Sequence, residues 1–228
     1  MSGRRLALAS LALLVAIVTA ALGVWQVERR AWKHALIARV EARLAAPPVA
    51  SPPPAQWNAV GAADAYTRVR AAGRYDMHAD TFVQAVTDLG PGWWVMTPLI
   101  TDTGAILINR GFVPDNRRGR TPAPAGEVIV TGLLRVSEPG GGFLRSNDPA
   151  AGRWYSRDVD AIARVRGYGR VAPFFIDRDA GAPGEWPRGG LTVVRFADNH
   201  LVYALTWFAL AALALFFLWR LVRGERGD

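Results

Sequence analysis

Two long runs of uncharged, mostly apolar residues lie at opposite ends of the chain. The first has 22 residues, from Leu6 to Val27, and the second has 19, from Leu201 to Trp219. A helix rises about 1.5 Å per residue, so each run can cross the roughly 30 Å hydrocarbon core of a bilayer. The sequence therefore predicts a membrane protein with two transmembrane helices rather than a free soluble enzyme.

These runs also predict the domain organisation. The first is longer than the 7–15 residues typical of a signal-peptide core, which favours an uncleaved anchor over a cleaved signal. The predicted segments are a cytoplasmic tail (1–5), a transmembrane helix (6–27), a juxtamembrane helix (28–46), a proline-rich linker (47–56), an extracytoplasmic domain (57–199), a second transmembrane helix (200–219) and a cytoplasmic tail (220–228). The basic residues flanking the runs are almost evenly divided, but a short arginine-bearing N-terminus usually stays inside. We expect a multi-pass protein of the bacterial inner membrane with a periplasmic central domain.

Composition excludes several classes of function. The net charge of +8 suggests nucleic acid at first, but residues 28–199 hold only 22 basic against 17 acidic residues, without a basic run that aromatic residues interrupt. Cysteine is absent, which excludes disulfides, thiolate nucleophiles and iron–sulfur clusters. Neither a nucleophile elbow nor a phosphate-binding glycine loop is present. We therefore expect no nucleic-acid partner and no enzymatic activity.

The region between the two runs is predicted to be rich in β-structure. Helix formers continue the first apolar run to about Leu44, before the prolines of the linker. Turn signals at roughly ten-residue spacing then separate short apolar segments, which is typical of an antiparallel sheet or small barrel. The predicted strands are 65–75, 81–87, 93–100, 105–113, 127–136, 171–176 and 191–196, with one short helix at 158–166. The predicted fold class is an α+β membrane protein.

Two clusters in this region carry further expectations. The segment Asn109-Arg110-Gly111 lies within a predicted strand and indicates a bulge or a close backbone approach at the glycine. Arg110 then pairs internally or meets a partner, and the first alternative is favoured. Neighbouring strand residues face opposite ways, so one of Trp93 and Trp94 fills the core and the other covers an edge or contacts the membrane.

The junction of the apolar runs with the domain holds the candidate site. His200 opens the second run, and Tyr203 and Trp207 follow it at helical spacing. The residues expected at the same membrane level on the first helix are Trp25, Gln26, Arg29, Arg30, Trp32 and Lys33. An imidazole with aromatic and basic neighbours could ligate a haem iron and bind its propionates. The alternative is that these residues are ordinary interfacial anchors, which chemistry alone favours.

Small residues recur on one face of each predicted span. Ala12, Ala16, Ala20 and Gly23 follow one another at helical spacing in the first run, and Ala204 and Ala211 share a face of the second. Small residues let helices approach closely in lipid. The abundance of alanine explains the pattern equally well.

Four separated motifs together resemble the Surfeit locus protein 1 family of cytochrome c oxidase assembly factors. They are Gly23-x-Trp25-Gln26-x-x-Arg29-x-x-Trp32-Lys33; Gly73-Arg74-Tyr75-Asp76; Pro91 to Leu99 with Ile108 to Pro114; and Gly189 to Thr192 with Asn199-His200-Leu201-x-Tyr203-Ala204-x-Thr206-Trp207. The last motif is the most specific. Asp198 stands where the family often has a second Asn, which places a negative charge beside His200, and Phe112 stands where it often has Trp.

The resemblance implies two functional hypotheses. In the first, the protein is a non-enzymatic, membrane-anchored factor that assists insertion of haem a into the catalytic subunit of a haem-copper oxidase, with haem a synthase as a further partner. His200 would then be the metal ligand, Arg29, Arg30 and Lys33 the propionate partners, and Trp25, Tyr203 and Trp207 the aromatic lining. In the alternative, the protein is a scaffold that stabilises the oxidase subunit through its β domain and spans, without contacting haem.

Overall fold

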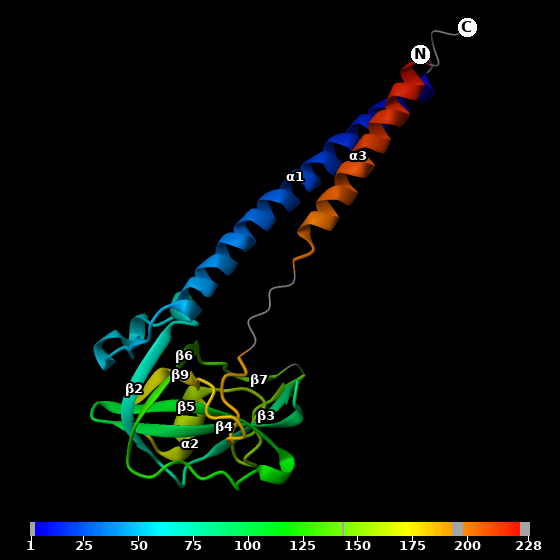
Figure 1. The fold of residues 1–228 in the computed structure, drawn as a ribbon. Coiled ribbons are helices and arrows are strands. Elements are labelled where there is room, and N and C mark those ends of the chain that lie inside the picture. Colours follow the sequence, from blue (N-terminus) through cyan, green and yellow to red (C-terminus); the bar gives the residue numbers. More distant parts are fainter. Residues whose placement is uncertain (1–2, 143, 193–197, 224–228) are drawn as a thin grey trace. The chain divides into compact units, whose positions relative to one another are not determined.

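The computed structural model describes residues 3–142, 144–192 and 198–223, which belong to two compact units. A helical unit comprises the chain up to Val40 and from Val194 onward, and a β domain comprises Glu41 to Val193. Each unit is described by itself below, and Figure 1 gives the labels of their elements.

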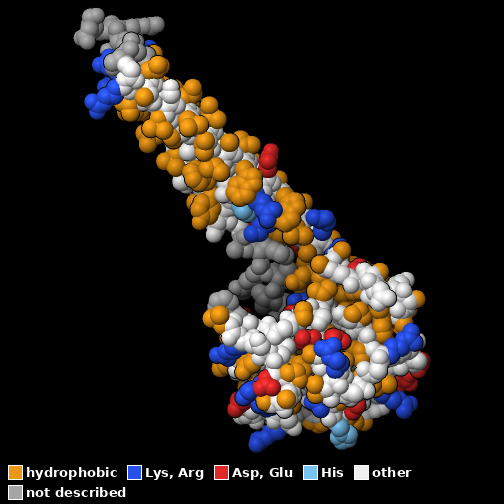
Figure 2. Space-filling model, turned by 180° about the vertical axis from the view of Figure 1, so that it is seen from behind, with side chains coloured by type: hydrophobic (Ala, Val, Ile, Leu, Met, Phe, Trp, Pro, Cys, Tyr) orange, Lys and Arg blue, Asp and Glu red, His pale blue; other side chains and the backbone are white. Residues whose placement is uncertain are grey.

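The helical unit pairs two long helices. Helix α1 (Gly3–Ala45) begins in this unit and ends in the β domain, and α3 (His200–Arg223) completes the pair. The predicted extension of the first helix to about Leu44 is confirmed. Both helices are long and apolar enough to cross a membrane, which suggests membrane anchoring. Most of their large apolar side chains are exposed, and Figure 2 shows this hydrophobic surface over the helical unit.

Small residues line the contact between α1 and α3. The buried residues of the pair are spaced three, four or seven apart, as in a left-handed coiled coil: Ala12, Ala16, Thr19 and Gly23 on α1, and Ala204 and Ala211 on α3. A Cβ atom on Gly23 would lie 2.6 Å from the ring of Phe208, so the helices approach closely at this point. The close-approach interpretation is confirmed at Gly23, but Thr19 takes the buried position expected of Ala20, which is half-buried.

The β domain is a small barrel. Its main sheet contains β1 (Val49–Ala50), β2 (Arg68–Tyr75), β3 (Thr81–Thr87), β4 (Gly90–Thr101), β5 (Gly104–Pro114), β6 (Glu127–Val136) and β9 (Val171–Arg178). The strand order is β1-β2-β6-β9-β5-β4-β3, and an additional pairing of β2 with β4 closes the ring. The predicted fold class is confirmed. The pairs β1–β2 and β5–β9 are parallel, and the other pairs are antiparallel.

Two apolar clusters hold the barrel together. One gathers inward-facing side chains of the closed ring, including Leu99, Ile108 and Phe174. The other packs β3, β4, β5 and β9 against helix α2 (Val159–Arg166), the predicted short helix. The side chain of Asp158 accepts a hydrogen bond from the backbone N–H of Ala161 and so caps α2.

Several short elements escaped prediction. The proline-rich segment contains β1, and 3₁₀ helices η1 (Pro54–Ala59), η2 (Ala62–Asp64) and η3 (Asp115–Arg117) occur in loops. Strands β7 (Gly141–Gly142) and β8 (Arg145–Ser146) pair separately from the main sheet. The expected strand 191–196 is not seen at Leu191 and Thr192, and its remaining residues lie outside the described part of the chain.

The expectation for the strand segment at Gly111 is confirmed. Gly111 has φ of +128°, and a Cβ atom there would lie 2.2 Å from the carbonyl oxygen of Arg188. The backbone N–H of Phe112 donates to that same oxygen at 2.9 Å. Arg110 is 4% exposed and donates to the carbonyl oxygens of Thr121 and Pro122, so its role is internal.

Candidate functional site

The imidazole of His200 lies at the first turn of α3 and contacts α1. Its Nδ1 atom lies 2.7 Å from Oε1 of Gln26. An amide oxygen can only accept a hydrogen bond, so Nδ1 donates and the lone pair of the neutral ring lies on Nε2. Among the described residues, no hydrogen bond to Nε2 occurs. A neutral imidazole oriented through one nitrogen, with the other available, is the form in which histidine binds metal ions.

A carboxylate just before α3 joins the two helices next to His200. Asp198 accepts a hydrogen bond from the backbone N–H of His200 at 3.1 Å, and its Oδ2 lies 2.7 Å from Nε2 of His34 and 3.5 Å from Nε of Arg30. The hydrogen bond from His34 lowers the pKa of Asp198, and the positive charge of Arg30 acts in the same direction. The carboxylate of Asp198 therefore contacts the backbone of His200 as well as the side chains of His34 and Arg30, and its effect on the His200 ring stays a prediction.

Sequence reasoning had assigned no role to His34. It lies one helical turn after Arg30 on α1, so the two side chains share a face of the helix. That spacing was the available signal, but nothing in the sequence linked this face to Asp198, which is 164 residues away.

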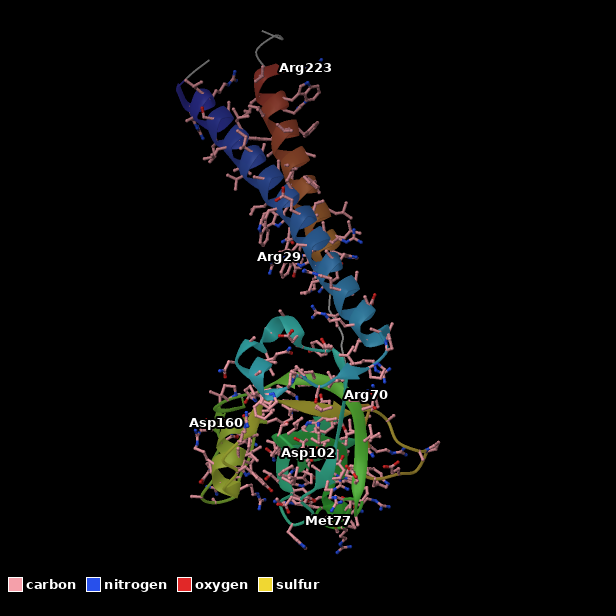
Figure 3. All side chains as sticks on the ribbon, turned by 90° about the vertical axis from the view of Figure 1, so that its left-hand side faces the viewer. Arg29, Arg70, Met77, Asp102, Asp160 and Arg223 are labelled. Atoms are coloured by element: carbon pink, nitrogen blue, oxygen red, sulfur yellow. The ribbon has the colours of Figure 1, made fainter. Side chains whose placement is uncertain are left out.

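The predicted basic residues differ in their surroundings. Arg29 lies over the ring of Trp32, at 4.1 Å from the ring centre, and forms no ion pair within the described part of the chain. Arg30 pairs with Asp198, and its Nε atom is buried without a hydrogen bond. Lys33 is half-buried. Figure 3 shows Arg29 on α1 in the helical unit. The helical unit thus brings two guanidinium groups and an imidazole to the same turns of α1 and the start of α3.

The predicted aromatic residues do not enclose His200. Trp25 and Tyr203 are 53% and 55% exposed, as interfacial anchors are before lipid covers them. Trp207 is half-buried on the face of α3 that also carries the buried Ala204. No ring stacking between His200 and these residues occurs in the described interactions. The role of Trp25, Tyr203 and Trp207 as an aromatic lining stays a prediction.

The described residues contain no group of three or more His, Asp or Glu side chains that could hold a metal ion. A metal that brings its own ligands, as in a macrocycle, needs only an axial nitrogen from the protein.

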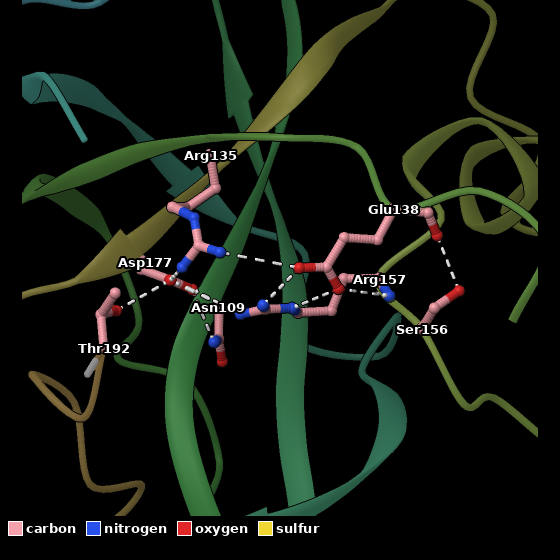
Figure 4. Close-up of polar contacts among 7 residues, drawn as sticks. All are labelled: Asn109, Arg135, Glu138, Ser156, Arg157, Asp177 and Thr192. Carbon is pink, nitrogen blue, oxygen red and sulfur yellow. Dashed lines mark hydrogen bonds and ion pairs between the residues drawn. The ribbon is translucent and has the colours of Figure 1, made fainter. Parts of the chain in front are cut away.

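A second polar cluster, which sequence reasoning missed, lies inside the β domain (Figure 4). Asp177 on β9 is 5% exposed and accepts hydrogen bonds from Asn109 at 2.7 Å, Arg135 at 2.8 Å, Arg157 at 3.1 Å and Thr192 at 2.9 Å. These four donors come from different segments of the chain, so the cluster fastens β5, β6 and the segment that leads towards α3 to β9.

Glu138 completes this cluster. Nε of Arg157 donates to Oε2 of Glu138 at 3.0 Å, and Ser156 donates to its backbone oxygen at 2.7 Å. Burial by itself lowers the pKa of Arg157, but the charges and hydrogen bonds of Asp177 and Glu138 outweigh it and raise that pKa. The cluster is charge-balanced and internally satisfied, which indicates a structural role.

Comparison with known proteins places both units in one family. The family described as SURF1 matches residues 13–212, from within α1 to within α3. The chain belongs to the SURF1 family. Among its relatives, it is 35% identical to human Surfeit locus protein 1, with 94% of this chain and 78% of the relative covered, and 34% identical to the mouse protein, with 91% and 72% covered. A SURF1-like protein of Monosiga brevicollis is 34% identical, with 94% and 87% covered.

The SURF1 match confirms the resemblance drawn from the four motifs. It includes the residues that carry the candidate site, Gln26, Arg30, His34, Asp198 and His200, together with the whole barrel. The two units therefore form part of a single family architecture.

Proposed function

We propose that this SURF1 protein is a membrane-anchored, non-enzymatic assembly factor for cytochrome c oxidase that assists insertion of haem a into the catalytic subunit. The observation that carries the proposal is the hydrogen bond between Nδ1 of His200 and Gln26, which leaves Nε2 free to act as an axial ligand. A cofactor chaperone needs a ligand that holds iron and then releases it, and a single imidazole suits such transient binding.

The surrounding residues fit this group. A haem supplies the iron, four ring nitrogens and two carboxylates. His200 would ligate the iron, and Arg29 is the freest candidate for a carboxylate because Asp198 already engages Arg30. Arg30 and Lys33 are further candidates on the same turns. Asp198 and His34 hold α1 and α3 together and so keep His200 beside Gln26.

The setting of the protein follows from the same proposal. Two membrane-spanning helices in the bacterial inner membrane would place the β domain in the periplasm, with the oxidase catalytic subunit as client and haem a synthase as donor. The apolar surfaces and lengths of α1 and α3 support the membrane location.

A haem a titration of the full chain in detergent tests the proposal. We expect His200→Ala to abolish the bound-haem spectrum, and His34→Ala to retain it, because the ring of His34 is engaged by Asp198. Gln26→Leu should weaken binding by about 10–100-fold, because it removes the group that orients the ligand. An unchanged spectrum in His200→Ala would show that the ligand assignment is wrong.

If the spectrum is unchanged, the scaffold alternative gains support. Co-purification of the oxidase catalytic subunit with the His200→Ala protein distinguishes the two. If the His200→Ala protein loses haem binding but still co-purifies with the oxidase subunit, His200 serves haem binding and other residues bind the subunit.

A further inference from the structure

Two neighbouring arginines of the β domain stack on aromatic rings. Both are far in sequence from His200 and the basic residues of α1. The guanidinium of Arg118 lies 3.9 Å from the centre of the Trp93 ring and 5.2 Å from that of Phe82. The neighbouring Arg117 lies 5.1 Å from the ring of Trp186. Such stacking holds a guanidinium in place and leaves its N–H edge available for a carboxylate.

This region carries an excess of positive charge. In this region, five arginines form no ion pair with a carboxylate of the described residues: Arg117, Arg118, Arg120, Arg145 and Arg188. One carboxylate, that of Asp115, lies among these arginines and lines the same hollow as Arg145; it accepts a hydrogen bond from the indole N–H of Trp93 at 3.0 Å. Charge complementarity therefore favours an acidic partner.

Two hollows meet at Gln84 and Trp93, and we call them together the Trp93 groove. One has a volume of about 390 Å³ and is lined by Val86, Gly92 and Arg145, among others. The other has about 370 Å³ and is lined by Arg118 and Gly152, among others. Small residues line both hollows: Ala85 and Gly92 the first, and Ala151 and Gly152 the second.

The groove borders an open sheet edge. Strand β3 is the last strand of the sheet, and the backbone N–H of Gln84 donates outward to Trp154 at 2.8 Å. By strand alternation the backbone of Val86 also faces outward, and in the described part of the chain it has no backbone partner beyond the sheet. Val86 is 83% exposed. An open sheet edge with a free N–H and C=O can form backbone hydrogen bonds with an extended peptide. A lipid headgroup has no peptide backbone, so this edge favours a peptide as the occupant.

We propose that the Trp93 groove binds an extended acidic segment of a partner protein, which adds to the edge of β3 at Val86 and places carboxylates on Arg118, Arg117 and Arg145. This inference is independent of haem binding, because no residue of the groove belongs to the His200 site. Haem titration of the same variants separates failure of one proposal from failure of the other.

The test uses the full chain in detergent and a fluorescent peptide of alternating glutamate and threonine, followed by anisotropy. We expect binding that weakens with added salt, and binding at least about tenfold weaker for the counterpart in which glutamine replaces glutamate. Arg117→Glu/Arg118→Glu should weaken binding by at least about tenfold. The matched control is Arg70→Glu/Arg74→Glu, which changes charge equally at two exposed arginines of β2 that form no ion pair with the described residues; Figure 3 labels Arg70.

Further variants test the mode of binding. Val86→Pro removes the outward N–H without changing charge, so it should weaken binding while the thermal midpoint stays close to that of the wild type. The proposal is overturned if the glutamate peptide does not bind, if both arginine pairs weaken binding equally, or if Val86→Pro has no effect. Displacement of the peptide by glycerol phosphate at equal concentration would identify a phosphate site and also overturn it.

Discussion

Replacing Asp177 by alanine should destabilise the β domain more than any exposed charge change. Asp177 is 5% exposed, and the side chains of its partners Arg157 and Arg135 are 12% and 17% exposed. Breaking a buried ion pair by removing one partner costs about 3–5 kcal/mol, because the remaining charge stays buried. Glu138 still compensates Arg157 and Arg135 in part, so we expect the lower end of that range, about 3 kcal/mol.

Urea unfolding of the full chain in detergent measures this loss, with tryptophan fluorescence as the signal because Trp57 and Trp154 are buried in the β domain. The control is Asp160→Ala, which removes an exposed carboxylate paired with Arg164 one helical turn away and should cost ~0.5 kcal/mol or less. If Asp177→Ala lowers the free energy of unfolding by no more than this control does, the cluster does not hold the barrel together.

Two further predictions concern backbone strain and pH. Gly111→Ala should lower the free energy of unfolding by at least about 3 kcal/mol, because the new Cβ atom meets both a positive φ and the carbonyl of Arg188. Gly119 also has a positive φ but has open space around it, so Gly119→Ala should cost about 1 kcal/mol. Equal losses for the two variants in thermal unfolding would contradict this reasoning. The hydrogen bond from His34 lowers the pKa of Asp198 in the folded state. This contact therefore stabilises the start of α3 at pH values above the ordinary pKa of an aspartate, and the stabilisation is lost as the pH falls through the lowered pKa. Hydrogen-exchange protection at that turn should fall in acid, and should not do so in Asp198→Asn.

Local patterns predicted most of the β domain because they act over a few residues. Strand β5 is mostly apolar, with Asn109 and Arg110 as exceptions, and all its residues except the two at its ends are buried because other elements cover both of its faces. The cap of α2 was visible as an acidic residue before a helical segment. Such signals need no knowledge of the rest of the chain.

Closure of the barrel and the Asp177 cluster needed information that the sequence does not carry locally. The β2–β4 pairing joins Arg74 to Ile100, and Asn109 and Asp177 meet across 68 residues. Only the register of several strands brings these groups together. Asp177 follows directly after the predicted strand 171–176, and its partners could not be chosen without the topology.

The sequence predicted some residues of the candidate site but not the contacts between them. His200, Arg29 and Arg30 were found because the ends of two apolar runs must lie at one membrane level. The orienting role of Gln26 and the contact of His34 with Asp198 depend on how α1 and α3 are rotated about their axes, which hydropathy does not determine.

The position of Gln26 along α1 has a consequence for the lipid. Gln26 is the penultimate residue of the uncharged run, so in a bilayer crossed by α1 its contact with His200 would lie at the boundary between hydrocarbon and headgroups. A thicker bilayer would draw this contact into hydrocarbon and remove water from the imidazole, whereas a thinner one would leave it hydrated. Acyl-chain length thus becomes a physical variable that sets the polarity around His200 without any change in the protein.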